Sequence, residues 1–237
     1  MRFLVWELPT YSWGSGKLPT LVDILERREI QAPVRYGITC RKAFPHLEPA
    51  DYLDLAFSTS AGIIQLREKD LRAGNLRQLV AQGVRLARTE RVIFFVNGEV
   101  RMALKEGADG VHLRSRQSIT KARQVRRESG VRNFVIGKSV HSVLEAVTAE
   151  DEGADYVMLG PIFPPISKTY STQPLGWSVL REAAQMLYIP VIAVGGIDSV
   201  TKKSVLTTQA FGEAGISWIK EEIEPLAEGN VRLRSPS

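Results

Sequence analysis

The stretch VIFFVNGEVRMALKEGADGVHL, Val92 to Leu113, contains the repeating unit that decides the fold. Its first residues, Val92–Val96, form an apolar run, which is typical of a strand covered on both faces of a parallel sheet. The segment EVRMALKE has a helical pattern, and Gly107 stands where that helix should end. A second apolar run, Gly110–Leu113, follows directly. A strand, a helix and a second strand in this order predict one unit of an α/β fold.

The same alternation recurs from Arg35 onward. Apolar runs are separated by polar loops and by helical stretches such as LRQLVAQGVRLAR and VLEAVTAEDEGA. Eight such runs predict a (β/α)8 TIM barrel, whereas six or seven would indicate an open doubly wound sheet. The expected strands are Tyr36–Thr39, Gly62–Leu66, Val92–Val96, Gly110–Leu113, Phe134–Gly137, Tyr156–Leu159, Val191–Val194 and Gly212–Ile216. The last run is the weakest, because Glu213 stands where an apolar residue is expected, and the pattern gives no physical account of it.

The chain divides into an N-terminal extension of residues 1–34, the barrel of residues 35–225, and a C-terminal tail of residues 226–237. Within the extension, LVDILERREI predicts a short amphipathic helix after Thr20. This helix could plug the barrel, bind a partner or belong to a poorly ordered tail, and the sequence does not choose among these roles.

Composition narrows the classes of protein. The 237 residues carry a modest formal charge of +5 and a single cysteine, Cys40, which excludes an intramolecular disulfide and favours a reducing cytoplasm. No apolar stretch approaches the roughly 18 to 20 residues that span a bilayer, so no membrane partner is expected. The densest basic run, Lys121–Arg132, fits the solvated face of an amphipathic helix, and no nucleic-acid-binding motif accompanies it. Nucleic acid is therefore not an expected partner.

Polar residues collect where the expected strands end, which is the reactive face of such a barrel. Period-2 alternation sends Gln65, Arg67 and Lys69 to one side of the second strand. On the inward side they would suit a phosphate or a carboxylate, and on the outward side the two cations would be solvated loop charges. Asn97 is interpreted most simply as a helix N-cap. His112, alone among apolar neighbours, is more typical of a packed, hydrogen-bonded core residue than of a ligand.

Three later loops complete this face. The loop GPIFPPISK reaches Lys168, which could close over an anion. Loops after the seventh and eighth strands of barrels often bind phosphate, and glycine there would let the backbone approach the ion. His141 lies in the loop after the fifth strand. The residues alone therefore predict a barrel enzyme for a small phosphorylated molecule, with His141 as its proton-transfer group. The expected phosphate-binding residues are Gly195, Gly196, Ile216 and Ser217.

The motifs YGITC, IIQLREK, FFVNGEV, DGVHL, IGKSVHS, ADYVMLGPIF, SK and IPVIAVGGI occur in this order between Arg35 and Glu222. In them the chain resembles the thiamin-phosphate synthase superfamily. The resemblance implies a (β/α)8 barrel and one of two activities. The synthases join a pyrimidine pyrophosphate to a thiazole phosphate using magnesium. The thiazole tautomerases (TenI-type proteins) aromatise a thiazole carboxylate phosphate without a metal.

Matched residue by residue, the resemblance implies two anion sites. Gly196, Ile216 and Ser217 match the cradle of the thiazole phosphate. The residues that match the pyrophosphate site are Gln65, Arg67, Lys69, Asn97, Ser139 and Lys168.

Two departures affect the metal. Gly98 and Gln117 stand where the synthases have metal-binding acids, and magnesium needs carboxylate oxygens as well as substrate phosphates. In the lid, Pro165-Ile166-Ser167 replaces a threonine-rich pattern. The expectation is therefore a site without a metal or cofactor.

The leading hypothesis is a TenI-type thiazole tautomerase, because those proteins match at VNGEV and at SVHS, where their catalytic histidine corresponds to His141. Ser142 and Glu145 supply a capping box, so the helix does not need the histidine, which is expected to be the general acid/base. The expected substrate is a small phosphorylated thiazole. A magnesium-dependent synthase with relocated ligands and a non-catalytic regulatory protein are the alternatives, and association into a homo-oligomer stays open.

Overall fold

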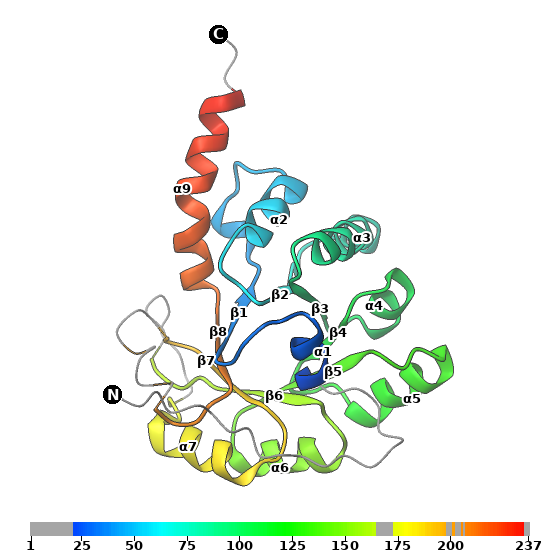
Figure 1. Ribbon diagram of the computed structural model, residues 1–237, viewed down its shortest axis with the longest axis vertical. Helices are drawn as coiled ribbons and strands as arrows, with labels where there is room; N and C mark the ends of the chain where they lie inside the picture. Colours follow the sequence, from blue (N-terminus) through cyan, green and yellow to red (C-terminus); the bar gives the residue numbers. More distant parts are fainter. Residues whose placement is uncertain (1–20, 165–172, 198–200, 202–204, 206, 235–237) are drawn as a thin grey trace.

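The computed structural model describes residues 21–164, 173–197, 201, 205 and 207–234, with the last six as backbone only. The chain forms a closed barrel of eight parallel strands, each paired with the next in sequence, and the first paired with the last. Figure 1 shows the strands as a central ring, with the first helix in its centre and the other labelled helices outside it. This confirms the (β/α)8 barrel. The strands are β1 (Val34–Ile38), β2 (Ile63–Leu66), β3 (Ile93–Asn97), β4 (Gly110–Leu113), β5 (Val135–Val140), β6 (Tyr156–Leu159), β7 (Val191–Val194) and β8 (Gly212–Gly215).

The outer layer consists of helices that pack on the apolar outer face of the strands. Gly107 and Gly130 end their helices with positive φ angles of 82° and 71°, as their positions in the sequence predict. The last helix continues through residue 226 as far as Arg234. The helices are α1 (Leu21–Arg27), α2 (Pro49–Phe57), α3 (Ala73–Thr89), α4 (Val100–Glu106), α5 (Ile119–Ser129), α6 (Val143–Asp151), α7 (Gly176–Met186) and α9 (Ser217–Arg234), with a 3-10 turn at Arg41–Ala43.

Helix α1 closes one end of the barrel. Leu21, Ile24 and Leu25 are buried in the same apolar cluster as the inward residues of the strands. Arg28, just after the helix, donates to the backbone oxygen of Val92 at 2.5 Å, where β3 is about to begin. The helix therefore seals the end at which the strands start, in the centre of the ring in Figure 1. Of the roles that the sequence left open for this helix, the structure supports the plug.

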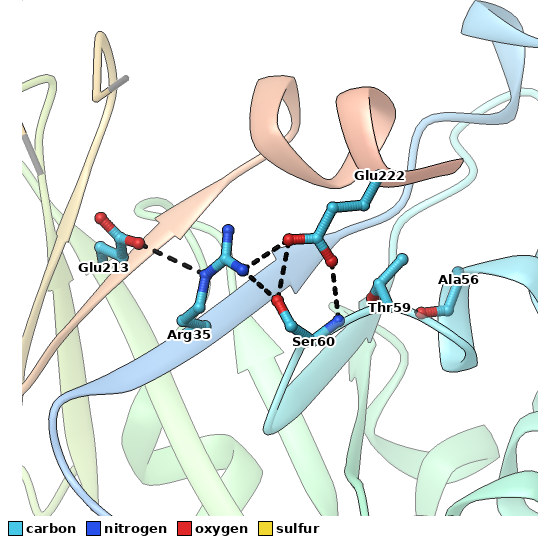
Figure 2. A network of polar contacts seen from close by, with 6 residues as sticks. All are labelled: Arg35, Ala56, Thr59, Ser60, Glu213 and Glu222. Atoms are coloured by element: carbon cyan, nitrogen blue, oxygen red, sulfur yellow. Dashed lines mark hydrogen bonds and ion pairs between the residues drawn. The ribbon is translucent and has the colours of Figure 1, made fainter. Parts of the chain in front are cut away.

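The unexpected Glu213 has a partner on the neighbouring strand. Glu213 pairs in register with Arg35 of β1, and the Arg35 Nε lies 3.6 Å from its Oε1. The guanidinium also donates to Glu222 of α9 at 2.5 Å (Figure 2). It lies over the ring of Trp218, 4.0 Å from the ring centroid. Glu222 in turn accepts from the Ser60 N–H at 2.7 Å. Through Arg35 and Glu222, the Glu213 carboxylate thus connects β8 with β1, with α9 and with the segment before β2.

Two acidic residues support the strands in the same way. Asp109 precedes β4 and accepts from the Phe94 N–H at 2.8 Å, and Asp155 precedes β6 and accepts from the Ile136 N–H at 2.7 Å. An arginine neutralises each carboxylate, and Arg126 lies 3.1 Å from Asp155. Burial nevertheless raises the pKa of Asp155 to about 6, against the opposing effect of Arg126.

Candidate active site

A chain of polar side chains crosses the barrel interior below the mouth. We call it the floor network; its members, in the order of their hydrogen bonds, are Asn97, Gln65, Tyr36, Tyr156, His112 and Ser139. They come from six different strands, and two of them, Tyr36 and Tyr156, also belong to the apolar cluster inside the barrel. Gly137 of β5 makes room for this arrangement, because a Cβ there would lie 2.0 Å from the Tyr156 ring.

The direction of the first bonds in the floor network follows from the hydrogens that each group carries. Gln65 donates through Nε2 to Asn97 Oδ1 at 3.0 Å, and its Oε1 accepts from the Tyr36 hydroxyl at 2.9 Å. Tyr36 has then used its only hydrogen, so the Tyr156 hydroxyl donates to Tyr36 across 2.9 Å. Because this bond turns the Asn97 oxygen towards Gln65, the Asn97 amide donor is available to a ligand.

The second half of the floor network is fixed by the charge state of His112. Burial, with the nearby Arg67 charge, lowers the pKa of His112 to about 3, so the imidazole is neutral and has one hydrogen. The Tyr156 oxygen accepts that hydrogen from Nδ1 at 2.9 Å, and Nε2 accepts from the Ser139 hydroxyl at 2.8 Å. The pKa values of both tyrosines are raised by burial as well. The floor is therefore uncharged, and the interpretation of His112 as a packed, hydrogen-bonded residue is confirmed.

The end of β2 brings positive charge to this floor. The Arg67 N–H donates to the buried Thr39 hydroxyl at 2.9 Å, and the next residue, Glu68, accepts from the Arg41 N–H at 3.1 Å. These bonds hold the segment that carries Arg67 and the exposed Lys69. The inward position of Gln65 agrees with the alternation that the sequence predicts, and the Arg67 charge acts on the buried His112.

Asn97 is not a helix cap. The N-cap of α4 is Glu99, two residues later, and no side chain caps that helix. Asn97 instead ends β3 and bonds to Gln65 inside the barrel, because the chain runs on through Gly98 before it turns into the helix. The simple interpretation of Asn97 is therefore wrong, and the residue belongs to the floor.

His141 lies directly after β5 and is exposed. Its Nδ1 lies 2.6 Å from the Gly160 carbonyl oxygen, which assigns the hydrogen to Nδ1 and leaves Nε2 to meet other groups. Ser142 caps α6 by accepting from the Glu145 N–H at 3.1 Å. The Glu145 carboxylate returns to the His141 N–H at 2.8 Å, one residue earlier than in a standard capping box.

The expected phosphate cradle lies over two paired strands, β7 and β8. Gly195 and Gly196 have positive φ angles of 92° and 65°. A Cβ on Gly196 would lie 2.6 Å from atoms of Phe163 and Pro164, so the glycine is required by the loop after β6 rather than by the approach of an ion. After β8, Ile216 precedes Ser217, the first residue of α9. The N–H of a first helical residue has no partner within the helix. Phosphate binding by these residues stays a prediction, and Lys168 lies outside the described residues.

The positions matched to metal-binding acids are occupied by a different arrangement. A Cβ on Gly98 would lie 2.7 Å from the guanidinium of Arg114. Gln117 donates to the Gly98 carbonyl at 2.9 Å and accepts from the Arg114 N–H at 2.9 Å. Within the described part of the chain, no three His, Cys, Asp or Glu side chains come together as a metal site. A guanidinium and an amide do not suit magnesium, so these residues do not fit the metal that the resemblance implies.

Comparison with known proteins identifies the family. The family profile described as thiamine monophosphate synthase matches residues 35–219. The chain belongs to this family. It is 37% identical over 182 residues to a thiamine-phosphate synthase from Geobacillus kaustophilus, covering 75% of this chain and 80% of that one. It is also 37% identical over 163 residues to a thiamine-phosphate synthase from Methanocella arvoryzae, covering 68% and 75% of the two chains.

A solved structure extends the similarity to three dimensions. Thiamine phosphate pyrophosphorylase from Pyrococcus furiosus superposes with a TM-score of 0.71 at 28% identity, over 89% of this chain and all of that one. The protein is thus a member of an enzyme family of thiamin biosynthesis. Among the described residues, no helix is long and apolar enough to cross a bilayer.

The prediction of a thiazole tautomerase is wrong. The similar proteins with assigned names are thiamine-phosphate synthases, which favours the alternative of a transferase. The tautomerase hypothesis depended on the matches at VNGEV and SVHS and on Gly98 and Gln117 in place of metal-binding acids. The identity of Gly98 and Gln117 bears only on the metal and does not specify the reaction. The role of His141 as the general acid/base of an isomerase depended on the tautomerase hypothesis and is no longer expected.

Sequence reasoning missed three residues of this site. Tyr36 and Tyr156 were counted as parts of apolar strands, although a buried tyrosine hydroxyl needs a hydrogen-bond partner, and that requirement could have indicated the floor network. Arg114 was not singled out at all. Its position over Gly98 depends on the backbone conformation of that glycine, for which the sequence gives no direct signal.

Proposed function

We propose that the protein is a transferase that makes thiamin phosphate from hydroxymethylpyrimidine pyrophosphate and a thiazole phosphate. The observation that carries the proposal is the identity of 37% to a thiamine-phosphate synthase over 75% of the chain. In this reaction the bond between the pyrimidine methylene carbon and the pyrophosphate breaks, the thiazole nitrogen bonds to that carbon, and inorganic pyrophosphate leaves.

The mouth above β2 to β5 supports the binding of the pyrophosphate. Asn97 can offer its amide donor, because its oxygen faces Gln65 and accepts from it. Arg67 brings positive charge close enough to lower the pKa of His112. Negative charge develops on the departing pyrophosphate, and a fixed cation beside it stabilises the transition state. The neutral floor adds no carboxylate that would repel the anion.

The neighbouring mouth above β7 and β8 supports the binding of the thiazole phosphate. The start of α9 at Ser217 presents backbone donors and the positive end of a helix dipole. The Phe163 N–H donates to the Gly195 carbonyl at 3.0 Å, which holds the glycine pair against the loop after β6. The two substrates would then lie over opposite sides of one barrel mouth.

The Ser139 hydroxyl has a more limited role than the resemblance implies. Its hydrogen is donated to His112 Nε2, so its oxygen presents lone pairs to the mouth. An anion gains nothing from lone pairs. Ser139 therefore contributes to the proposed function by fixing the imidazole, and Asn97 and Arg67 provide the donors.

The test is an assay for thiamin phosphate. The protein is incubated with hydroxymethylpyrimidine pyrophosphate and thiazole phosphate, with and without magnesium, and the product is separated by chromatography. Product formation supports the proposal, and Asn97→Ala should reduce the rate by about tenfold or more, because one donor to the leaving group is lost. Absence of product under both conditions, with both substrates shown to bind, would exclude the transferase. The single Cys40 is consistent with action in the cytoplasm, which is part of the same proposal.

A further inference from the structure

We propose that Arg114 supplies to the substrate's pyrophosphate the positive charge that a divalent cation would otherwise provide. This inference rests on the proposed function, because it concerns the same pyrophosphate. It follows from the poor fit between magnesium and the residues at positions 98 and 117.

Arg114 lies at the mouth because of its position relative to β4. It comes two residues after His112, whose side chain is inside the barrel, and side chains two apart on an extended chain project to the same side. The Arg114 side chain is 55% exposed, so a ligand at the mouth can reach it. On one side β4 pairs with β3, and β3 ends at Asn97, which carries an amide donor.

Gly98 provides the space for the guanidinium. Its φ of 77° turns the backbone, and its N–H donates to the His112 carbonyl at 2.9 Å. Any Cβ at this position would lie 2.7 Å from both Nε and Nη2 of Arg114. An acid at position 98 and the present placement of Arg114 therefore exclude each other.

Gln117 fixes the loop that carries Arg114. Its amide bonds to the Gly98 carbonyl and to the Arg114 N–H, each at 2.9 Å. The Lys138 ammonium donates to the Gln117 carbonyl from the neighbouring strand. The two positions at which the resemblance places metal ligands thus serve here to hold an arginine.

The charges around Arg114 favour an anion. Arg67 directly follows β2, the strand on the other side of β3, so the segments that carry the two arginines lie on either side of the strand that ends at Asn97. Arg114 forms an ion pair with Glu99, whose Oε1 lies 3.5 Å from Arg114 Nη2. Glu99 is 48% exposed, and ion pairs between exposed side chains are weak, so a pyrophosphate with several charges can displace it.

Calorimetric titration with inorganic pyrophosphate in EDTA and low salt tests the proposal. The wild-type protein should bind without magnesium, and Arg114→Gln should weaken binding about tenfold or more, because a charge-assisted donor pair is lost. Arg116→Gln is the matched control, because Arg116 is an exposed arginine in the same loop and its replacement removes the same charge. Equal loss in the two variants, or wild-type binding only in the presence of magnesium, would overturn the proposal.

A second variant tests the contact itself. Gly98→Ala should push the flexible end of Arg114 away and weaken pyrophosphate binding, and combining it with Arg114→Gln should add little, since both changes remove one interaction. Gly130→Ala controls for backbone strain, because Gly130 has a φ of 71° and open space around it. Fully additive losses in the double variant would contradict the contact. Thermal melting checks that each variant is folded.

These outcomes separate the inference from the proposed function. Metal-free pyrophosphate binding through Arg114 without thiamin phosphate formation would retain the anion site and reject the transferase. Thiamin phosphate formation with pyrophosphate binding that depends on magnesium and not on Arg114 would retain the transferase and reject the inference.

Discussion

Arg35 and Glu213 lie opposite each other in register on β1 and β8, so their ion pair crosses the seam where the two ends of the barrel sequence meet. The Glu213 side chain is only 4% exposed and the Arg35 side chain 26%. In such a position a charge is tolerated because its partner is present, and removing one partner costs more than the pair contributes.

Arg35→Met should lower the free energy of unfolding by about 3–5 kcal/mol, because it leaves the Glu213 carboxylate buried beside no cation from β1. Urea denaturation at neutral pH measures the change. Arg91→Met is the control, since its pair with Glu29 is 74% and 77% exposed and should contribute almost nothing. The double variant Arg35→Met with Glu213→Met should recover much of the loss, and no recovery would show that the pair itself is not the cause.

His112→Gln should change how stability depends on pH. The folded pKa of about 3 lies below the ordinary value of 6.5, so the unfolded chain binds a proton first as the pH falls. The stability that neutral His112 contributes is present above pH 6.5 and is lost as the pH falls towards 3. Urea denaturation at several pH values from 7 to 4 should therefore show the wild type losing stability faster than the variant.

Asp155 has the opposite effect on the pH dependence of stability in that experiment. Its folded pKa of about 6 exceeds the ordinary 3.8, so the folded state binds this proton first. Because Asp155 is present in both proteins, the difference between their curves isolates His112. Parallel curves would contradict a neutral, buried imidazole in the floor network.

Gly196→Ala should raise the KM for the thiazole phosphate and lower the melting temperature. The added Cβ would lie 2.6 Å from backbone oxygens of Phe163 and Pro164, so the loop after β6 and the backbone of the expected phosphate site have to shift apart. Gly176→Ala is matched in backbone strain, with a φ of 77°, but meets nothing within 4 Å. Steady-state kinetics should separate the two variants, and the same KM in both would attribute the effect to strain alone.

Leu21→Ala should destabilise the protein by about 2–5 kcal/mol, because it opens a cavity in the plugged end of the barrel. Leu21 is fully buried, whereas Leu144 is 76% exposed and Leu144→Ala should have little effect. Because the plug and the mouth lie at opposite ends of the strands, the KM for either substrate should not change in Leu21→Ala. A changed KM with full stability would contradict the plug.

The eight strands could be predicted from the sequence because each is a short apolar run before a helical pattern. The observed strand boundaries differ from the predicted ones where pairing between strands decides them. For example, β1 begins at Val34 because that residue pairs with Gly212 of β8. Glu213 could not be explained from its neighbours in sequence, because its partner Arg35 lies on the first strand. The cap of α6 by Ser142 could be predicted, since the bond is local.

The site was harder to predict because its contacts join strands that are distant in sequence. Asn97 precedes a helix and was interpreted as its cap, but Gly98 delays the helix and turns Asn97 into the barrel. The identity of Gly98 and Gln117 was interpreted as the loss of a reaction. In the structure these two residues make room for Arg114 and hold its loop, which no pattern along the chain indicates.

The packing of Arg114 over Gly98 also restricts how this lineage can change. A single substitution of Gly98 by an acid meets the guanidinium, and a single substitution of Gln117 by an acid loses its donor bond to the Gly98 carbonyl. A change toward the two-acid arrangement therefore moves the Arg114 guanidinium out of its present place. The side chains at the three positions are thus coupled, and the three residues are expected to be inherited as one block.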